Sequence, residues 1–170
     1  GLRAVFRYND GQTDDAALTR AVVASALELG ATLAMPARLL GAARESHGYR
    51  LRYEQDGEER ETTCYTLVNA AGPWVEDVRA LIQPEPRGRN VDLVGGTHIE
   101  VPGTLERGIY YTEAPRDQRA VFHMPWKGRT LVGTTERVYD ADPRGIEPTP
   151  DEIEYLRETF AHHFPSRSTD

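Results

Sequence analysis

A glycine pair followed by a histidine is the first stretch of this sequence that could do chemistry. Residues 95–101 read Gly-Gly-Thr-His-Ile-Glu-Val. The alternation predicts a strand in which His98 and Ile99 face opposite sides. An imidazole exchanges protons near neutral pH, so His98 is a candidate base for proton abstraction. The alternative is a strand histidine whose hydrogen bond is purely structural.

A second glycine precedes two hydroxyl side chains at the end of another predicted strand. Gly133 is followed by Thr134 and Thr135. Hydroxyls beside an accessible main chain suit a polar ligand. The alternative is that Gly133 marks a β-bulge and binds nothing.

Small residues follow a short apolar run at residues 66–74, which read Thr-Leu-Val-Asn-Ala-Ala-Gly-Pro-Trp. This pattern predicts a buried strand whose carboxyl end carries little side-chain bulk. In open α/β sheets, ligands bind at that end. The alternative is a buried strand followed by a turn that binds nothing, with Pro73 opening the next helix and Trp74 in the core.

Several well-known kinds of site have no counterpart in the sequence. It holds no Gly-x-Gly-x-x-Gly, no P-loop, no zinc spacing and no nucleophile elbow. The one cysteine, Cys64, is interpreted as a packing residue rather than a nucleophile. His162 and His163 are adjacent on a predicted helix and point in different directions, so we expect no metal site.

The chain before residue 74 predicts a strand–helix–strand unit and a meander. Residues 13–15 supply an N-cap and two first-turn carboxylates for a helix that ends at Gly30. We expect this helix to pack against a sheet. The strands are expected over residues 3–8, 31–34, 38–45, 49–55 and 60–66.

The chain beyond a proline-, glycine- and arginine-rich segment at residues 83–90 predicts an antiparallel sheet and a helix. A hairpin is expected to turn at residues 125–128. A capping box at residues 149–152 begins the last helix, which should pack on the sheet. Its apolar stripe is Ile153, Leu156 and Phe160. The strands are expected over residues 91–94, 97–101, 108–112, 119–125 and 129–135.

These elements predict an α+β fold of two domains. Residues 1–86 form a partial Rossmann-like region with a β-meander, and residues 87–170 form an antiparallel β-sheet with packed helices. The net charge of -7 argues against nucleic acid as a partner, because phosphate binding needs a basic face. No apolar run approaches the roughly 20 residues that span a bilayer. The abrupt ends lead us to expect a piece of a longer protein.

Five stretches, in this order and at this spacing, resemble those of one enzyme family. The chain is similar to the middle of the FAD-dependent (aerobic, respiratory) glycerol-3-phosphate dehydrogenases, within the amino-acid-oxidase-like flavoprotein superfamily. The resemblance covers nearly the whole chain, although Glu136 stands where the family usually has aspartate. The stretches are Tyr-Asn-Asp-Gly-Gln-Thr-Asp-Asp at 8–15, Gly-Ala-Thr at 30–32, Val-Asn-Ala-Ala-Gly-Pro-Trp at 68–74, Gly-Thr-His-Ile-Glu-Val-Pro at 96–102 and Leu-Val-Gly-Thr-Thr-Glu at 131–136.

The resemblance implies a reaction and a place for the candidate residues. The full enzyme would bind FAD, oxidise sn-glycerol 3-phosphate to dihydroxyacetone phosphate by hydride transfer to the flavin, and pass electrons to membrane quinone. The second domain would be the substrate-binding cap over the flavin. His98 would take the proton of the C2 hydroxyl, with Thr97 and Thr134 as substrate-binding candidates. The candidates for FAD binding are Arg38, Leu39, Ala70, Ala71, Gly72 and Trp74.

The resemblance also implies what the chain lacks. The family's dinucleotide fingerprint and the segment that holds substrate phosphate fall outside it. We therefore expect the 170-residue chain neither to retain FAD nor to oxidise glycerol 3-phosphate, and to self-associate through open sheet edges. The parent would be cytoplasmic, associated peripherally with the inner face of the cytoplasmic membrane, and would act in glycerol metabolism.

Two other functions stay open. One is another oxidase of the same superfamily that acts on an amine or amino acid. The other is a non-catalytic binding module. The sequence does not distinguish quinone from oxygen as electron acceptor, and it leaves the oligomeric state open.

Overall fold

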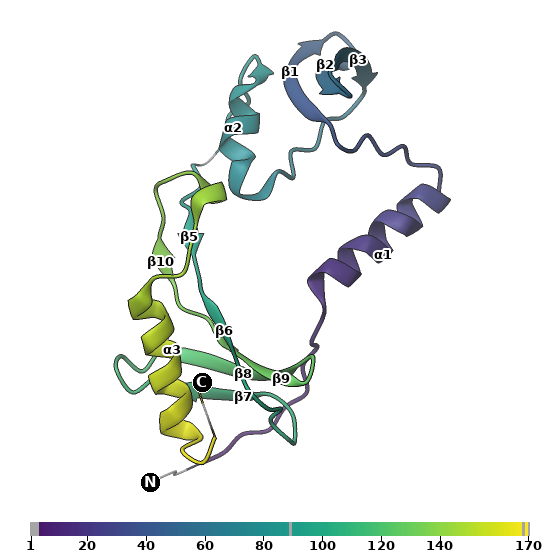
Figure 1. Ribbon diagram of the computed structural model, residues 1–170. Coiled ribbons are helices and arrows are strands. Elements are labelled where there is room, and N and C mark those ends of the chain that lie inside the picture. The colour runs from purple at the N-terminus through teal and green to yellow at the C-terminus, as the bar shows by residue number, and fades with distance from the viewer. Residues whose placement is uncertain (1–3, 89, 168, 170) are drawn as a thin grey trace. The chain divides into compact units, whose positions relative to one another are not determined.

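The computed structural model describes residues 4–88, 90–167 and 169 of the chain (Figure 1). The described part is a mixed α/β structure with several sheets and three α-helices. It divides into two compact units, residues 1–67 and residues 68–170. The functional boundary expected between residues 86 and 87 stays a prediction.

The first unit contains helix α1 (Asp15–Glu28), which begins one residue later than predicted, with Asp14 rather than Thr13 as its N-cap, and ends before Gly30 as predicted. The Asp14 side chain caps it by accepting a hydrogen bond from the Ala17 N–H at 3.0 Å. Gly30 follows its end with φ +94°, a left-handed conformation that glycine adopts without a steric penalty. No residue of α1 is buried, so the expected packing against a sheet is not found in the described structure.

Two predicted strands in this unit are absent. Residues 4–8 and 31–34 have no regular secondary structure, and residue 3 lies outside the described residues. A strand is stable only when its N–H and C=O groups pair with a neighbour. Neither segment has such a neighbour among the residues that the structure describes, so the apolar alternation alone was a misleading signal.

The predicted meander is confirmed as strands β1 (Arg38–Glu45), β2 (Gly48–Gln55) and β3 (Glu58–Cys64), paired antiparallel in that order. The turn between β2 and β3 consists of Asp56 and Gly57, both with positive φ. Two such residues make the hairpin turn whose twist matches that of the strands. The last strand begins two residues earlier than residue 60, where we expected it.

Residues 66–71, which span the boundary between the two units, form no strand. The prediction of a buried strand here is wrong, and Val68 is 77% exposed. A short 3₁₀ turn, Gly72–Trp74, leads into helix α2 (Val75–Ala80) and the two-residue strand β4 (Ile82–Gln83). Trp74 is exposed rather than in the core.

An antiparallel four-stranded sheet forms the centre of the second unit. Its order is β6-β9-β8-β7. A smaller ladder pairs β5 with β10, and a second 3₁₀ turn spans Pro143–Gly145. The strands are β5 (Val94–Gly95), β6 (His98–Val101), β7 (Tyr110–Glu113), β8 (Ala120–Trp126), β9 (Arg129–Gly133) and β10 (Arg137–Val138).

The strands of the second unit differ from the prediction at three places. The hairpin between β8 and β9 turns only at Lys127 and Gly128, both with positive φ, because Trp126 pairs with Arg129. Strand β10 was not predicted, since its two residues are too few to show a period. Strand β5 is shorter than the run expected at residues 91–94.

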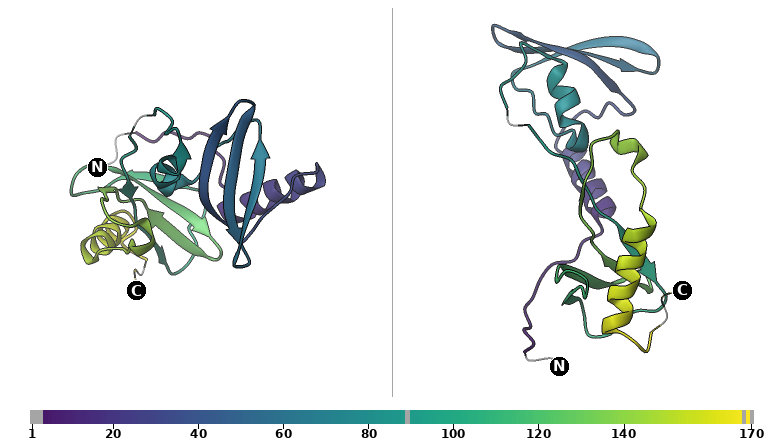
Figure 2. Two further views of the ribbon diagram at one scale, coloured as in Figure 1. Left: turned by 90° about the horizontal axis from the view of Figure 1, so that it is seen from above. Right: turned by 90° about the vertical axis from the view of Figure 1, so that its left-hand side faces the viewer.

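Helix α3 (Pro150–His163) packs on one face of the sheet, as both views of Figure 2 show. Its capping box is present, with Thr149 and Glu152 bonded to each other's main chain. The buried stripe contains Thr159 in place of the predicted Ile153, which is 36% exposed. The core consists of Val101, Leu105, Ala114, Val121, Val132, Leu156 and Phe160.

Candidate functional site

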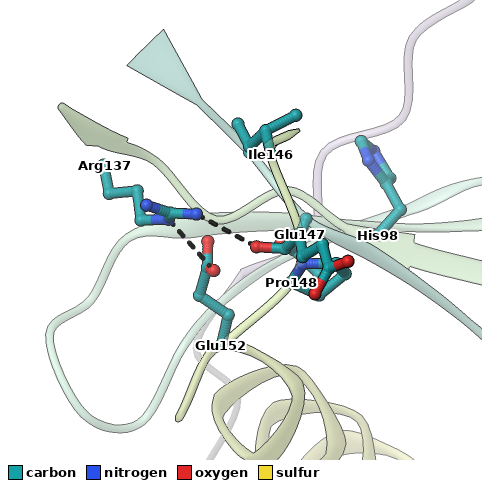
Figure 3. A pocket seen from close by; sticks show the side chains of 8 residues that line it. His98, Arg137, Ile146, Glu147, Pro148 and Glu152 are labelled. Carbon is teal, nitrogen blue, oxygen red and sulfur yellow. Dashed lines mark hydrogen bonds and ion pairs between the residues drawn. The ribbon is translucent and has the colours of Figure 1, made fainter. Parts of the chain in front are cut away.

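A cavity of about 130 Å³ lies where β6 begins, beside the approach to helix α3 (Figure 3). It brings together residues that are far apart in sequence, among them the predicted histidine. In Figure 3 the His98 imidazole lies on the opposite side of the cavity from the pair formed by Arg137 and Glu152. The lining residues are Gly96, Thr97, His98, Arg137, Ile146, Glu147, Pro148 and Glu152.

Glu152, at the start of α3, is a buried carboxylate with several partners. Its Oε1 accepts a hydrogen bond from Thr135 Oγ1 at 2.6 Å, and its Oε2 accepts one from the Thr149 N–H at 2.9 Å. Arg137 Nε lies 3.2 Å from Oε2 and pairs with its charge. Burial alone would raise the pKa of Glu152, but the hydrogen bonds from Thr135 and Thr149 outweigh it and hold the pKa at about 2. The carboxylate is therefore ionised at neutral pH.

Thr135 connects Glu152 to the strand that carries the histidine. Its Oγ1 accepts a hydrogen bond from the Thr97 N–H at 2.9 Å, and its own N–H donates to the Thr97 carbonyl at 3.3 Å. Gly96 permits this approach, because a Cβ there would lie 2.7 Å from the Thr135 carbonyl oxygen. The start of β6 is thus fixed to the end of β9 and to α3.

His98 lies at the start of β6, with its imidazole against Gly133 of the neighbouring strand. Burial on that side lowers the pKa of His98 below its ordinary value of 6.5. The imidazole makes no hydrogen bond with any residue that the structure describes, so the alternative of a hydrogen-bonded structural histidine is not found. A neutral imidazole with a free nitrogen can accept a proton.

The row across the sheet from His98 is apolar. Strand register places Gly133 opposite His98, Phe122 opposite Gly133, and Tyr111 opposite Phe122. The rings of Tyr111 and Phe122 are 4.6 Å apart between centroids. This row lies on the sheet face opposite the core residues Val121 and Val132, because side chains alternate along a strand.

Sequence reasoning missed Phe122 and Tyr111. Both lie in strands that were predicted, and the alternation within each strand was visible. The order in which the four strands pair, β6-β9-β8-β7, was not visible in the sequence. This order places the rings of Phe122 and Tyr111 in the row of His98.

The small-residue stretch is an open turn held by one side chain. Asn69 donates through Nδ2 to the Val75 carbonyl at 2.8 Å and accepts from the Ala71 N–H at 3.2 Å. Gly72 has φ +56°, and a Cβ built there meets nothing within 4 Å. Ala70 is exposed and Ala71 is half-buried, so the main chain here is accessible.

Arg38 and Leu39, predicted to lie near the adenine end of the cofactor, are in the other unit. They begin strand β1. Arg38 is exposed and pairs with Glu54 at 2.9 Å. An exposed ion pair contributes little to stability, so this guanidinium can exchange partners at small cost.

The two predicted substrate-binding threonines have different surroundings. Thr97 is buried, with 6% of its surface exposed, and its hydroxyl helps to lower the pKa of Glu152. Thr134 is exposed, and its hydroxyl donates to the Thr135 carbonyl at 2.8 Å. Only Thr134 could reach a ligand without rearrangement.

In the part of the chain that the structure describes, no cluster of three or more His, Cys, Asp or Glu side chains could hold a metal ion. Within the same residues, no helix has the length and apolarity needed to cross a membrane. Cys64 is half-buried at the end of β3 and unpaired with another cysteine.

The chain belongs to the FAD-dependent oxidoreductase family. The family's model, described as DAO, FAD dependent oxidoreductase, matches residues 1–170. This confirms the resemblance that the sequence motifs indicate, and it fits the open small-residue turn and the exposed imidazole described above.

The relatives within this family act on polyol phosphates according to their names. A glycerol-3-phosphate dehydrogenase of Pseudomonas aeruginosa is 35% identical over 170 residues, which is 96% of this chain and 32% of the relative. A D-erythritol 1-phosphate dehydrogenase of Brucella abortus is 33% identical over 165 residues, covering 95% of this chain and 33% of the relative. An aerobic glycerol-3-phosphate dehydrogenase of Escherichia coli is 31% identical.

A solved structure shares the fold. The glycerol-3-phosphate dehydrogenase from Bacillus halodurans, complexed with FAD, matches with a TM-score of 0.77 and 24% identity, covering 94% of this chain and 33% of that one. The chain therefore spans about a third of the length of the relatives it matches.

Proposed function

We propose that this chain is part of an FAD-dependent dehydrogenase that oxidises sn-glycerol 3-phosphate to dihydroxyacetone phosphate. The observation that carries the proposal is the position of His98. It is an exposed imidazole that makes no hydrogen bond with any described residue, in a chain that a flavoprotein family matches from end to end. The names of several relatives supply the substrate.

His98 acts as the base in this proposal. Oxidation of the C2 alcohol to a ketone removes a proton from the hydroxyl and a hydride from the carbon. The lowered pKa of His98 keeps its imidazole neutral at pH 7 and able to accept that proton. When bound, FAD supplies the acceptor for the hydride. Thr134, with an exposed hydroxyl, contacts the substrate, and Thr97 holds the strand through Glu152.

The proposed contacts to FAD belong to two segments. Ala70, Ala71 and Gly72 offer an accessible main chain without bulky side chains, and Trp74 is exposed beside them. Arg38 and Leu39 contribute to the adenine end. In this proposal residues 1–86 belong to a partial Rossmann-like FAD domain and residues 87–170 to the substrate cap.

Electrons pass on to membrane quinone, and the whole enzyme is a cytoplasmic protein held peripherally on the inner face of the membrane. The word aerobic in the name of the Escherichia coli relative supports a respiratory acceptor. A quinone-reduction assay with and without oxygen tests this part.

A second substrate is favoured by a specific observation. The D-erythritol 1-phosphate dehydrogenase, at 33% identity, lies between glycerol-3-phosphate dehydrogenases that are 35% and 31% identical to this chain. Both substrates are polyol phosphates with a secondary alcohol, so His98 would do the same chemistry on either.

The test is an assay of the complete protein encoded by the open reading frame that contains this chain. We expect it to bind FAD and to reduce a dye with sn-glycerol 3-phosphate faster than with D-erythritol 1-phosphate. The reverse preference would support the second substrate. Oxidation of sarcosine or a D-amino acid, but of neither polyol phosphate, would favour an amine oxidase. A reading frame without a dinucleotide-binding segment would favour a binding module.

The 170-residue chain alone is proposed to be inactive and to lose FAD on purification. It spans about a third of the length of its relatives, and the proposal places the dinucleotide-binding segment outside that third. A purified chain that is yellow, with flavin absorbance, would contradict this expectation.

A further inference from the structure

We propose that Gly133 is a positioning residue for His98: the missing side chain on β9 leaves the space in which the imidazole lies, and so fixes the direction in which its nitrogens point. The inference rests on the proposed function, in which His98 is the base. The proposal adds Gly133 to the site, because a residue without a side chain is needed there to make room for the imidazole.

The strand register creates the space. Gly133 pairs with His98 on one side and with Phe122 on the other. Directly opposed residues of antiparallel strands have Cβ atoms about 4.5–5.5 Å apart, close enough for side chains to touch. A glycine in the central strand therefore opens a gap one side chain wide between His98 and Phe122.

The imidazole occupies this gap. A Cβ built on Gly133 would overlap Cγ and Cδ2 of His98, and it would lie 2.8 Å from Nε2. Carbon atoms in good contact are about 3.5–4.0 Å apart, so no methyl group fits. Gly133 is not among the glycines with positive φ, so its φ does not require glycine, whereas the close contact with His98 does.

Packing against Gly133 orients the His98 ring, because no hydrogen bond to a described residue does so. Histidines in catalytic sites are commonly held by a hydrogen bond to the second ring nitrogen. His98 has no such bond with any described residue, whereas its neighbour Thr97 is fixed by Thr135 and Glu152. The main chain is thus held firmly, and Gly133 determines where the ring on it lies.

An alanine at position 133 must push the ring away from the strand into solvent. The loss of that contact removes the burial that lowers the pKa of His98. The midpoint of its titration should therefore rise toward 6.5, the ordinary value for histidine. At neutral pH a larger fraction of the imidazole would then already carry a proton and be unable to accept another.

Nuclear magnetic resonance on the isotopically labelled 170-residue chain tests this. The ring signals of its five histidines are followed from pH 8 to pH 4, with His98→Asn used for assignment. We expect a nuclear Overhauser contact between the His98 ring and the Gly133 α-protons. We also expect the His98 midpoint to rise measurably in Gly133→Ala, because the burial that lowers its pKa is lost.

Gly145→Ala is the matched control. Gly145 is in the same unit, has no positive φ, and a Cβ there would meet only the Tyr139 hydroxyl at 4.0 Å. It should leave the His98 midpoint unchanged.

Two results would overturn the proposal. One is the absence of a contact between the His98 ring and Gly133 in the unaltered chain, a measurement that does not depend on a variant folding. The other is a folded Gly133→Ala chain with an unchanged His98 midpoint. Neither measurement involves turnover, so an active His98→Asn enzyme would refute the base role separately and leave the positioning result as it stands.

Discussion

The Thr135 hydroxyl donates a hydrogen bond of 2.6 Å to the buried carboxylate of Glu152. This contact joins the segment after β9 to the first turn of α3, and the same carboxylate accepts from the Thr149 main chain and pairs with Arg137. Glu152 thus caps the helix and braces the strand ends beside His98 with one side chain.

Replacing Glu152 with glutamine should destabilise the chain. The amide keeps the shape but loses the charge that faces Arg137, and its NH₂ group cannot accept the hydrogen bonds that one carboxylate oxygen now accepts. We expect the free energy of unfolding in urea to fall by about 1–3 kcal/mol.

The control for this prediction is Glu154→Gln, two positions along the same helix on its exposed side. It should change the free energy of unfolding by no more than about 0.5 kcal/mol. If the two substitutions lowered the free energy of unfolding equally, the hydrogen bonds of Glu152 would contribute no stability beyond that of a negative charge at the start of the helix.

The buried His123 should make stability depend on pH. Its side chain is fully buried in β8, with Nε2 2.8 Å from the Thr112 hydroxyl and Nδ1 unpartnered. It faces Phe160, His163 and Phe164 of the helix and its end. Burial, assisted by the charge of His163, lowers the pKa of His123 to about 4.

The sign follows from the protons bound in each state. In the unfolded chain His123 titrates near 6.5, and in the folded chain near 4, so between these values the unfolded state binds more protons. Stability is fully present above pH 6.5 and is lost as pH falls toward 4, by at most about 3 kcal/mol. Urea unfolding at pH 7.5, 6, 5 and 4 measures this.

His123→Phe should remove this component of the pH dependence, because phenylalanine fits among the rings and carries no titrating group. The change in unfolding free energy between pH 7.5 and pH 5 should be smaller in the variant than in the unaltered chain. Parallel curves for the two proteins would show that His123 does not cause the acid sensitivity.

Two positions of α3 test where the core lies. Leu156 is fully buried against the sheet, whereas Ile153, predicted to share its stripe, is 36% exposed. Leu156→Ala should cost about 2–5 kcal/mol, as large-to-small core substitutions do. Ile153→Ala should cost clearly less, and thermal unfolding of the two variants side by side decides it.

The edge strands suggest self-association. Strands β6 and β7 are the two edges of the four-stranded sheet in the second unit, and their outer N–H and C=O groups have no ladder partner in that sheet. Light scattering should show an apparent mass that rises with concentration. A strictly monomeric mass at high concentration would contradict this expectation.

Local signals predicted most of the regular elements. Asp14 and Thr149 are the N-caps of α1 and α3. Each accepts a hydrogen bond from an N–H group of its own helix, so no residue distant in sequence is needed to recognise the helix start. The meander was visible because its turns carry glycine or polar residues and its faces alternate. These features depend on residues that are close in sequence, so they can be recognised from the amino-acid sequence alone.

The features that the sequence did not predict correctly depend on contacts between residues that are distant in sequence. The apolar run at residues 66–71 resembles a buried strand, but a strand needs partners, and the structure gives it none among the described residues. The ring row of Phe122 and Tyr111, and the contact of His98 with Gly133, follow from strand order and register. A single sequence holds no direct record of either.

The candidate site was predicted in part for the same reason. His98 was recognised by its residue type and its strand, and in the structure it is exposed and has no hydrogen bond to a described residue. Glu152 was noticed only as a helix cap. Its second function, bracing Thr97 and Thr135, arises from contacts with two segments distant in sequence.

The most direct test of the proposed function is the turnover of His98→Asn in the complete FAD-loaded enzyme, compared with His47→Asn, which alters an exposed turn histidine. We predict that kcat for sn-glycerol 3-phosphate falls by about 10²–10⁴-fold in His98→Asn, with flavin absorbance unchanged, and stays constant in His47→Asn. A His98→Asn enzyme that retains FAD and full kcat would contradict the assignment of His98 as the base.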